Sequence, residues 1–273
     1  MSLGIVIKGP EGIVLAADSR LTVTATLPPN PAAPGVLMQL PVNFDNSTKL
    51  LTFNGHHRWI GAVTFGDATI GQANDLRTAQ SFLSAFELTL PEERLTVAAF
   101  AQSLSDFFMN EWNTRMPQGH VSAGMSFVIG GFDADEAYGS MYELNIPNTP
   151  VPVEQMHNDF GLNFGGQKEI TERLMQGYDA QVLAIITDVL GLTPAQVASV
   201  QTALAALQIS VPLQLLPLQD CIDLAVFLIR TTTSAQSLSI GLRGVGGAID
   251  VAVITQQNGI EIIQRKGLTA DKS

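Results

Sequence analysis

The sequence has 273 residues, of which 46% are hydrophobic and only 14% are charged. A chain of this composition buries a large core, and so little charge leaves apolar surface that predicts self-association. The net charge of -11 opposes binding to nucleic-acid backbones, and no apolar run reaches the roughly 18 residues of a membrane span, so we expect neither partner.

The N-terminal half begins with strand patterns. Residues 3–7 and 13–17 are β-branched-rich runs around a Gly-Pro-Glu-Gly turn, which predicts a hairpin. A second hairpin is predicted at 49–53 and 59–63. Between them, the stretch at about 26–47 carries five prolines, which predicts a surface excursion without a regular element.

Helices and strands then alternate in blocks. Apolar residues at three-and-four spacing predict helices, and β-rich runs predict strands. The expected helices are 67–86, 96–109, 168–177, 194–207 and 220–231, and the expected strands are 121–131, 138–145, 248–255 and 260–263. Hairpin pairs with helices in blocks indicate an α+β fold with antiparallel sheets. We expect one domain over 1–273, with an extra helical insertion at about 185–218.

The cysteine and histidine residues give no indication of a disulfide or a metal site. Cys221 is the single cysteine and lies in an apolar run, which predicts a buried thiol. The absence of an internal disulfide and of a secretory signal pattern leads us to expect a cytoplasmic protein. The histidines lack metal-ligand spacing, and the Gly-Gly segments lack the context of a phosphate-binding loop. We therefore expect no metal and no cofactor.

Four segments, in order along the chain, carry a resemblance to a known family. They are Gly12–Thr22 (GIVLAADSRLT), Lys49–Leu50 with Ile60–Ala68, Val128–Asp133 (VIGGFD) and Gly246–Thr255 (GGAIDVAVIT). Together they resemble proteasome β subunits, and residues 164–173 resemble the bacterial proteasome homologue Anbu. The resemblance implies the N-terminal-nucleophile (Ntn) hydrolase fold, a four-layer αββα sandwich of two antiparallel sheets flanked by helices.

The resemblance also implies a catalytic set. It places the nucleophile at Ser2, sixteen positions before Asp18, with the α-amino group of Ser2 as general base once Met1 is removed. Asp18 and Lys49 resemble the acidic partner and the active-site lysine, and the backbone N–H of Val63 resembles the oxyanion donor, with Ala62 as the fallback.

The sequence departs from the family pattern at several positions. Serine replaces threonine at position 2, and Val63 stands where glycine is usual. Gly166 stands in place of a serine, and the family's aspartate and serine before the last Gly-Gly are replaced near Leu242 and Val245. Either Ser237 or Ser239 is a candidate to replace these polar groups.

The predicted function is hydrolysis of peptide bonds inside a self-assembled ring or helical ring, with peptides or unfolded proteins as substrates. Two alternatives stay open: a non-catalytic structural subunit, and an amidohydrolase of the same fold that acts on small molecules. The sequence does not show whether an ATPase delivers substrates.

Overall fold

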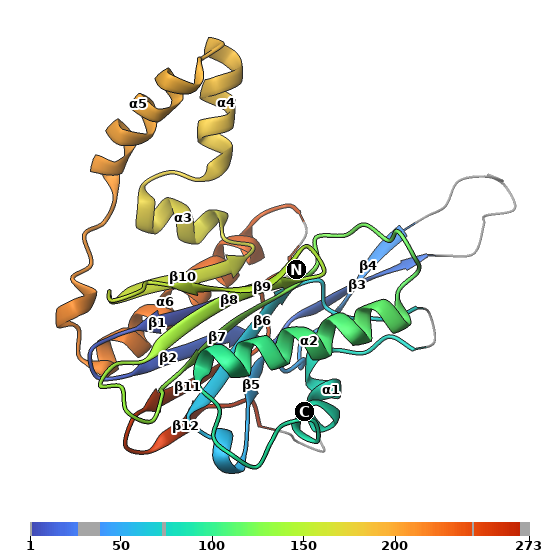
Figure 1. Cartoon of the computed structure of the whole chain (residues 1–273). Coiled ribbons are helices and arrows are strands. Elements are labelled where there is room, and N and C mark those ends of the chain that lie inside the picture. The colour runs from blue at the N-terminus through green and yellow to red at the C-terminus, as the bar shows by residue number, and fades with distance from the viewer. Residues whose placement is uncertain (1, 27–38, 73–74, 242, 268–273) are drawn as a thin grey trace, which may run out of the picture.

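The N-terminal hairpin forms the middle of a five-stranded sheet (Figure 1). The computed structural model describes residues 2–26, 39–72, 75–241 and 243–267. Strands β1 (Leu3–Lys8) and β2 (Ile13–Asp18) pair antiparallel, and the Gly9 N–H closes their turn by donating to the Gly12 carbonyl. Every residue of both strands is buried. Both faces of β1 and β2 are covered, which explains the apolar runs at 3–7 and 13–17.

Two five-stranded sheets organise the chain, and all neighbouring strands in them are antiparallel. The first has the order β10-β1-β2-β11-β12, with β10 Gly161–Gly166, β11 Ile249–Thr255 and β12 Gly259–Gln264. The second has the order β5-β6-β7-β8-β9, comprising β5 Leu50–Thr52, β6 Ile60–Gly66, β7 Met125–Gly131, β8 Ser140–Ile146 and β9 Thr149–Gln155. The predicted α+β class with antiparallel sheets is confirmed.

Alternation along β1 divides its side chains between two cores. Ile5 and Ile7 pack with helix α6 (Leu218–Leu238) and with α3 (Glu169–Gln176), whereas Val6 packs toward the second sheet. On the second sheet, a separate core joins α1 (Ala79–Glu87) and α2 (Val97–Arg115) to the strands. The two sheets share a core that includes Val6, Ile13, Leu15, Leu50, Val63 and Val128.

The helix predicted over 67–86 is much shorter in the structure. Among the described residues of this range only α1 is helical, and Ile70 and Arg77 of the preceding segment form a bridge. Gly66 and Gly71 have φ of +86° and +119°, values outside the right-handed helical region. Glycine backbone conformation therefore overrides the helical spacing of the apolar residues there.

The proline-rich stretch contains a strand that the sequence did not predict. β3 (Leu21–Thr26) and β4 (Gln39–Phe44) form a two-stranded ribbon in which Pro41 pairs with Thr24. Each strand of a two-stranded ribbon has a free edge, where a missing N–H costs no ladder bond. The exclusion of regular structure is therefore wrong for 39–44. Pro28, Pro29, Pro31 and Pro34 lie outside the described residues.

Two edge strands were also not predicted. β9 contains Pro150 and Pro152, and β10 ends in Gly165 and Gly166. These residues are depleted in central strands but are tolerated at sheet edges. The strand expected from 121 begins only at Met125.

A helical arm projects from the body of the molecule at the top of Figure 1. It comprises α4 (Ala180–Leu190) and α5 (Pro194–Leu204), neither of which has a buried residue. The arm overlaps the insertion predicted at about 185–218 but begins earlier. Short 3-10 helices lie at Gly55–His57 (η1), Ala205–Leu207 (η2) and Leu213–Leu215 (η3). Within the described ranges, no helix is long and apolar enough to cross a bilayer.

Candidate active site

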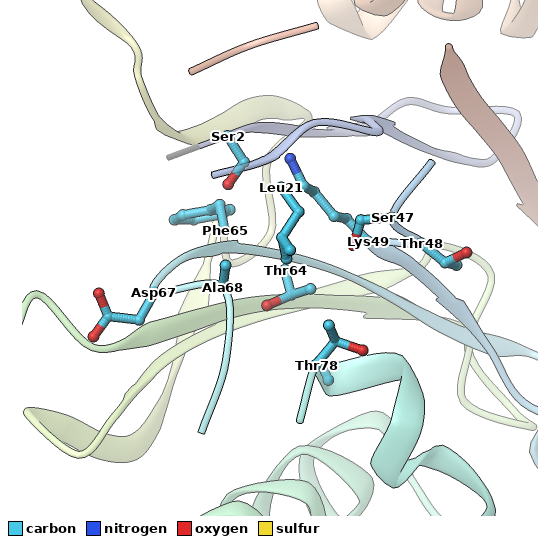
Figure 2. Close-up of a pocket in the computed structure, with 11 residues that line it drawn as sticks. Ser2, Leu21, Ser47, Thr48, Lys49, Thr64, Phe65, Asp67, Ala68 and Thr78 are labelled. Atoms are coloured by element: carbon cyan, nitrogen blue, oxygen red, sulfur yellow. The ribbon is translucent and has the colours of Figure 1, made fainter. Parts of the chain in front are cut away.

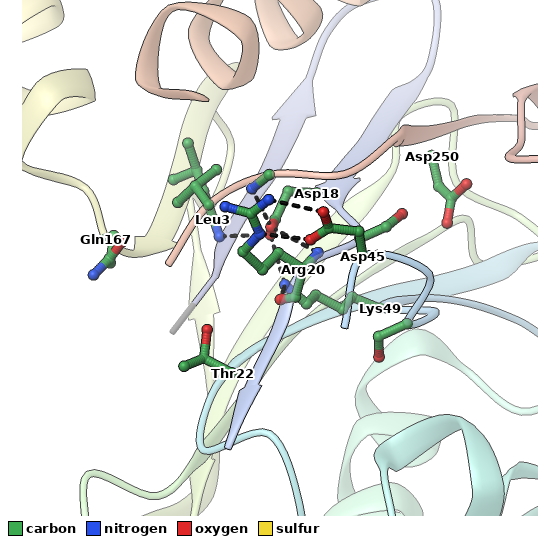
Figure 3. A network of polar contacts seen from close by, with 12 residues as sticks. Leu3, Asp18, Arg20, Thr22, Asp45, Lys49, Gln167 and Asp250 are labelled. Carbon is green, nitrogen blue, oxygen red and sulfur yellow. Dashed lines mark hydrogen bonds and ion pairs between the residues drawn. The ribbon is translucent and has the colours of Figure 1, made fainter. Parts of the chain in front are cut away.

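The Asp18 carboxylate is the anchor of the candidate site. Asp18 is the last residue of β2 and is 1% exposed. Its Oδ1 accepts the Leu3 N–H at 3.0 Å, and its Oδ2 accepts the N–H groups of Arg20 and Gly246, each at 3.0 Å. These bonds hold a negative charge in a buried position at the junction of four segments (Figure 3).

Lys49 completes a buried ion pair with Asp18. Its Nζ lies 2.7 Å from Asp18 Oδ1 and also donates to the Arg20 carbonyl. Burial lowers the pKa of Lys49 because an ammonium loses its hydration there, and Asp18 opposes this shift. The structure thus brings together two of the predicted site residues, thirty-one positions apart in the sequence.

Ser2 faces the same space as Lys49. Ser2 directly precedes β1, is 3% exposed and lines a hollow of about 20 Å³ together with Lys49, which is room for little more than one water molecule. Figure 2 shows the Lys49 side chain extending toward Ser2, with Ser2 just before β1 and Lys49 just before β5. The remaining wall is formed by Leu21, Ser47, Thr48, Thr64, Phe65, Asp67, Ala68, Thr78 and Ala79.

A larger groove adjoins this hollow. The groove has a volume of about 610 Å³ and shares Leu21, Ser47, Thr48 and Thr78 with the hollow. Its other walls come from the base of the β3–β4 ribbon and the start of α1. The groove therefore provides open space next to the hollow that Ser2 and Lys49 line.

The structure does not bring Val63 into the hollow. Thr64 donates its N–H to the Lys49 carbonyl at 2.9 Å, so the N–H of the preceding residue faces the other way, toward β7. There the cross-strand partner of Val63 is Val128. Ala62 is fully buried in the core on the helical side of the sheet. Neither predicted oxyanion donor lines the hollow.

A pair of glutamines supports the N-terminal segment. Gln167 donates its backbone N–H to the Ser2 carbonyl at 2.7 Å, and its side-chain Oε1 accepts from Gln236 Nε2 at 2.7 Å. Gln236 Oε1 in turn accepts the Val245 N–H at 2.9 Å. The sequence reasoning missed this network, since glutamines at positions 167 and 236 have no local signal that links them.

The two serines proposed as substitutes lie elsewhere. Ser237 and Ser239 are exposed, and their hydroxyls donate to carbonyls of α6, those of Ser234 and Gln236. They do not reach Ser2 by any hydrogen bond in the described part of the chain. Leu242 lies outside the described residues.

An exposed ion pair flanks the site. Arg20 donates to both carboxylate oxygens of Asp45, at 2.6 and 2.8 Å (Figure 3), and these bonds raise the pKa of Arg20. A bidentate pair of this kind fixes the ribbon base relative to the loop that precedes Lys49.

A second lysine–aspartate pair was also missed. Lys266 Nζ lies 2.6 Å from Asp250 Oδ2 and donates to the Ser47 carbonyl at 3.0 Å. The two side chains are almost fully buried. The sequence gives little indication of this pair. Asp250 lies within a predicted strand, and Lys266 lies in the tail after the last predicted strand.

The remaining polar candidates do not join the site. Cys221 lies on α6 with its side chain buried, and burial raises the pKa of its thiol. His157 pairs with Glu154 at 2.8 Å, and His57 is buried near Phe100. Across the residues that the structure describes, no group of three or more histidine, cysteine, aspartate or glutamate side chains is placed to hold a metal ion.

Solved structures with the same fold cover nearly the whole chain. A helical assembly of the Anbu complex from Pseudomonas aeruginosa superposes with a TM-score of 0.57 at 15% identity, over 99% of this chain and 88% of that chain. A Gly-1 mutant of Anbu from Hyphomicrobium sp. strain MC1 gives 0.55 at 13% identity, over the same shares. No protein-family model and no curated protein matches the sequence. The chain thus shares the fold of Anbu complex proteins.

Proposed function

We propose that this protein is a peptidase of the Ntn hydrolase class, with the four-layer αββα sandwich in a single domain and with Ser2 as nucleophile. One observation carries the proposal: Ser2 and Lys49 line one hollow, and Asp18 holds Lys49 through a buried ion pair. A hydroxyl is a weak nucleophile until a neighbouring base or cation activates it, and Lys49 is a cation placed next to Ser2.

The chemistry assigns each residue one step. Removal of Met1 frees the α-amino group of Ser2, which accepts the hydroxyl proton as Oγ attacks the substrate carbonyl. The ammonium of Lys49 lowers the pKa of both groups on Ser2. The leaving amine takes up that proton, and a water molecule then hydrolyses the Ser2 ester and restores the hydroxyl. Asp18 is a positioning residue, because it touches Lys49 rather than the substrate.

Self-association belongs to the same proposal. The related Anbu complex forms a helical assembly, and the arm of this chain exposes Ile185, Val189 and Leu190 on α4. Exposed apolar side chains gathered on one element typically mark an interaction site. We propose that copies of this chain associate in a ring or helical ring and that unfolded peptide segments are the substrates.

A non-catalytic structural subunit is the second candidate. The departures from the family pattern at Gly166 and near Val245 favour it, because polar side chains that orient a nucleophile in the family are absent at those positions. The fold and the self-association would be the same in either case. The two candidates differ in whether Ser2 reacts.

The test is covalent labelling of Ser2. The protein is incubated with a hydroxyl-reactive electrophile, digested and mapped by mass spectrometry, which also reports whether Met1 is removed. The proposal predicts an adduct on Ser2 that is lost in Lys49→Met and kept in Thr48→Ala, a change to another hydroxyl of the same hollow. Labelling elsewhere, or Met1 retained in every molecule, would contradict it. Turnover of small amides with no cleavage of fluorogenic peptides would indicate a small-molecule amidohydrolase.

A further inference from the structure

The Lys266–Asp250 pair has an unusual placement for an ion pair. The ammonium group of Lys266 donates to Asp250 Oδ2 at 2.6 Å, and the backbone N–H of Lys266 donates to Asp250 Oδ1 at 3.0 Å. The side chains are only 8% and 4% exposed. Buried pairs contribute little net stability, because loss of hydration offsets most of the attraction. The position of this pair therefore calls for an explanation other than stability.

Lys266 reaches both segments that form the candidate site. Its Nζ bonds the Ser47 carbonyl at 3.0 Å and the Ser19 hydroxyl at 3.4 Å. Ser19 follows Asp18, Ser47 lies two residues before Lys49, and the Ser47 N–H donates to the Ser19 carbonyl at 2.9 Å. One ammonium group thus ties together the chain segments on either side of the Asp18–Lys49 pair.

We propose that Lys266 is a positioning residue of this site, which holds the segment that carries Lys49 and places a second positive charge beside it. Its meaning for catalysis rests on the proposed function. The position of Lys266 does not depend on the proposed function, because it follows from hydrogen bonds among described residues. Lys266 touches neither Ser2 nor any group expected to react.

Charged groups from five segments surround Lys49 or its charged neighbours. The groups are Asp18 at the end of β2, Arg20 before β3, Asp45 in the loop after β4, Asp250 on β11 and Lys266 after β12. Lys266 and Arg20 both lower the pKa of Lys49, in addition to the effect of burial, and Asp18 raises it. We therefore expect the pKa of Lys49 to rise when the charge of Lys266 is removed, and to fall when the charge of Asp250, the partner of Lys266, is removed.

The direct test follows the titration of Lys49. The protein is labelled with 13Cε-lysine, the Lys49 signal is assigned with Lys49→Arg, and its chemical shift is followed against pH. We expect the midpoint to rise by at least ~0.5 pH unit in Lys266→Met and to fall in Asp250→Asn, with the double variant close to wild type. A residue that only stabilised the fold would not give shifts of opposite sign. An unchanged midpoint in both single variants would overturn the proposal.

Two further variants control for charge and burial. Lys266→Arg keeps the positive charge, so the Lys49 midpoint stays near that of wild type. Lys8→Met removes another buried lysine, at the far end of β1, roughly 20 Å from Ser2 along the strand, and leaves the midpoint unchanged. Should Lys266→Met fail to fold, Asp250→Asn alone decides the question by the sign of its shift.

A second readout separates this proposal from the proposed function. The rate of electrophile labelling at Ser2 is measured against pH, and both limbs of the profile move to higher pH in Lys266→Met, because a lost cation raises the pKa of every neighbouring group. A shifted Lys49 midpoint in a protein that is never labelled at Ser2 upholds the positioning role and overturns the peptidase. Labelling at Ser2 with an unchanged midpoint and unchanged limbs overturns the positioning role alone.

Discussion

Gly166 leaves no room for a side chain beside Ser2. Its φ is +97°, and a β-carbon built on it would overlap the Ser2 carbonyl oxygen. β10 pairs with β1 at this point, with Gly166 opposite Leu3. The close approach of the two backbones explains why glycine stands at position 166, where the resemblance implies a serine.

Gly166→Ala therefore tests that close approach. We expect the substitution to lower the free energy of unfolding by more than ~2 kcal/mol, because it combines an unfavourable φ with overlap, and to abolish labelling of Ser2. Gly119→Ala is the matched control, since Gly119 has a φ of +76° with nothing near its missing β-carbon. Urea denaturation measures the free energy of unfolding of the two variants. Equal losses in the two variants would show that overlap with Ser2 contributes nothing.

Asp18→Asn should destabilise the protein strongly. The change leaves the Lys49 ammonium buried without its charge partner, which typically costs ~3–5 kcal/mol. Asp45→Asn breaks the Arg20 pair instead, at a carboxylate that is 47% exposed, and we expect a loss below ~1 kcal/mol. Urea denaturation of both variants at neutral pH makes the comparison. A loss for Asp18→Asn as small as that for Asp45→Asn would mean that Lys49 is not charged in the folded protein.

The pH dependence of stability should reveal the buried amine of Lys49. Burial lowers the pKa of Lys49 in the folded protein below its value of 10.5. Between the two values the unfolded chain binds more protons, so the free energy of unfolding rises with pH across that window. Lys49→Met lacks this titrating group, and we expect a flatter curve in the pH range directly below 10.5. Parallel curves for the two proteins in that range would contradict the lowered pKa.

The helical arm should govern assembly. We expect the double substitution Ile185→Ser, Val189→Ser to shift the protein to smaller species in sedimentation velocity, because it removes apolar side chains that are 60% and 73% exposed. The control is Leu88→Ser, Val121→Ser, at two exposed apolar residues outside the arm. Circular dichroism checks that the helices persist. An unchanged size distribution in the arm variant would place the contact elsewhere.

Cys221 should be unreactive in the folded protein. Its thiol is buried against Gly9, and burial raises its pKa, so little thiolate forms at neutral pH. We expect a thiol-reactive dye to modify it at least ~100-fold more slowly in native protein than in urea. Reaction at similar rates in both conditions would show that α6 opens readily from the sheet.

Local sequence pattern determined the elements that are buried on both faces or on one helical stripe. β1, β2 and β11 consist mainly of apolar residues, and α2 has apolar residues at helical spacing. Their burial leaves a periodicity that can be recognised from the residues alone. The resemblance, not the pattern, singled out Ser2, Asp18 and Lys49, and the structure places these three residues together.

The tertiary structure alone decided which strands form the sheet edges and that the Lys266–Asp250 pair lies beside the site. β9 and β10 are strands because neighbouring strands supply their hydrogen bonds, despite proline and glycine contents that oppose strand formation. Lys266 meets Asp250 and Ser47 only because β12 folds back along β11. The pairing of β6 with β5 and β7 decides that the Val63 N–H faces β7 and not the hollow. Contacts between distant segments leave no periodic trace in a sequence, and these contacts set the surroundings of Ser2 and Lys49.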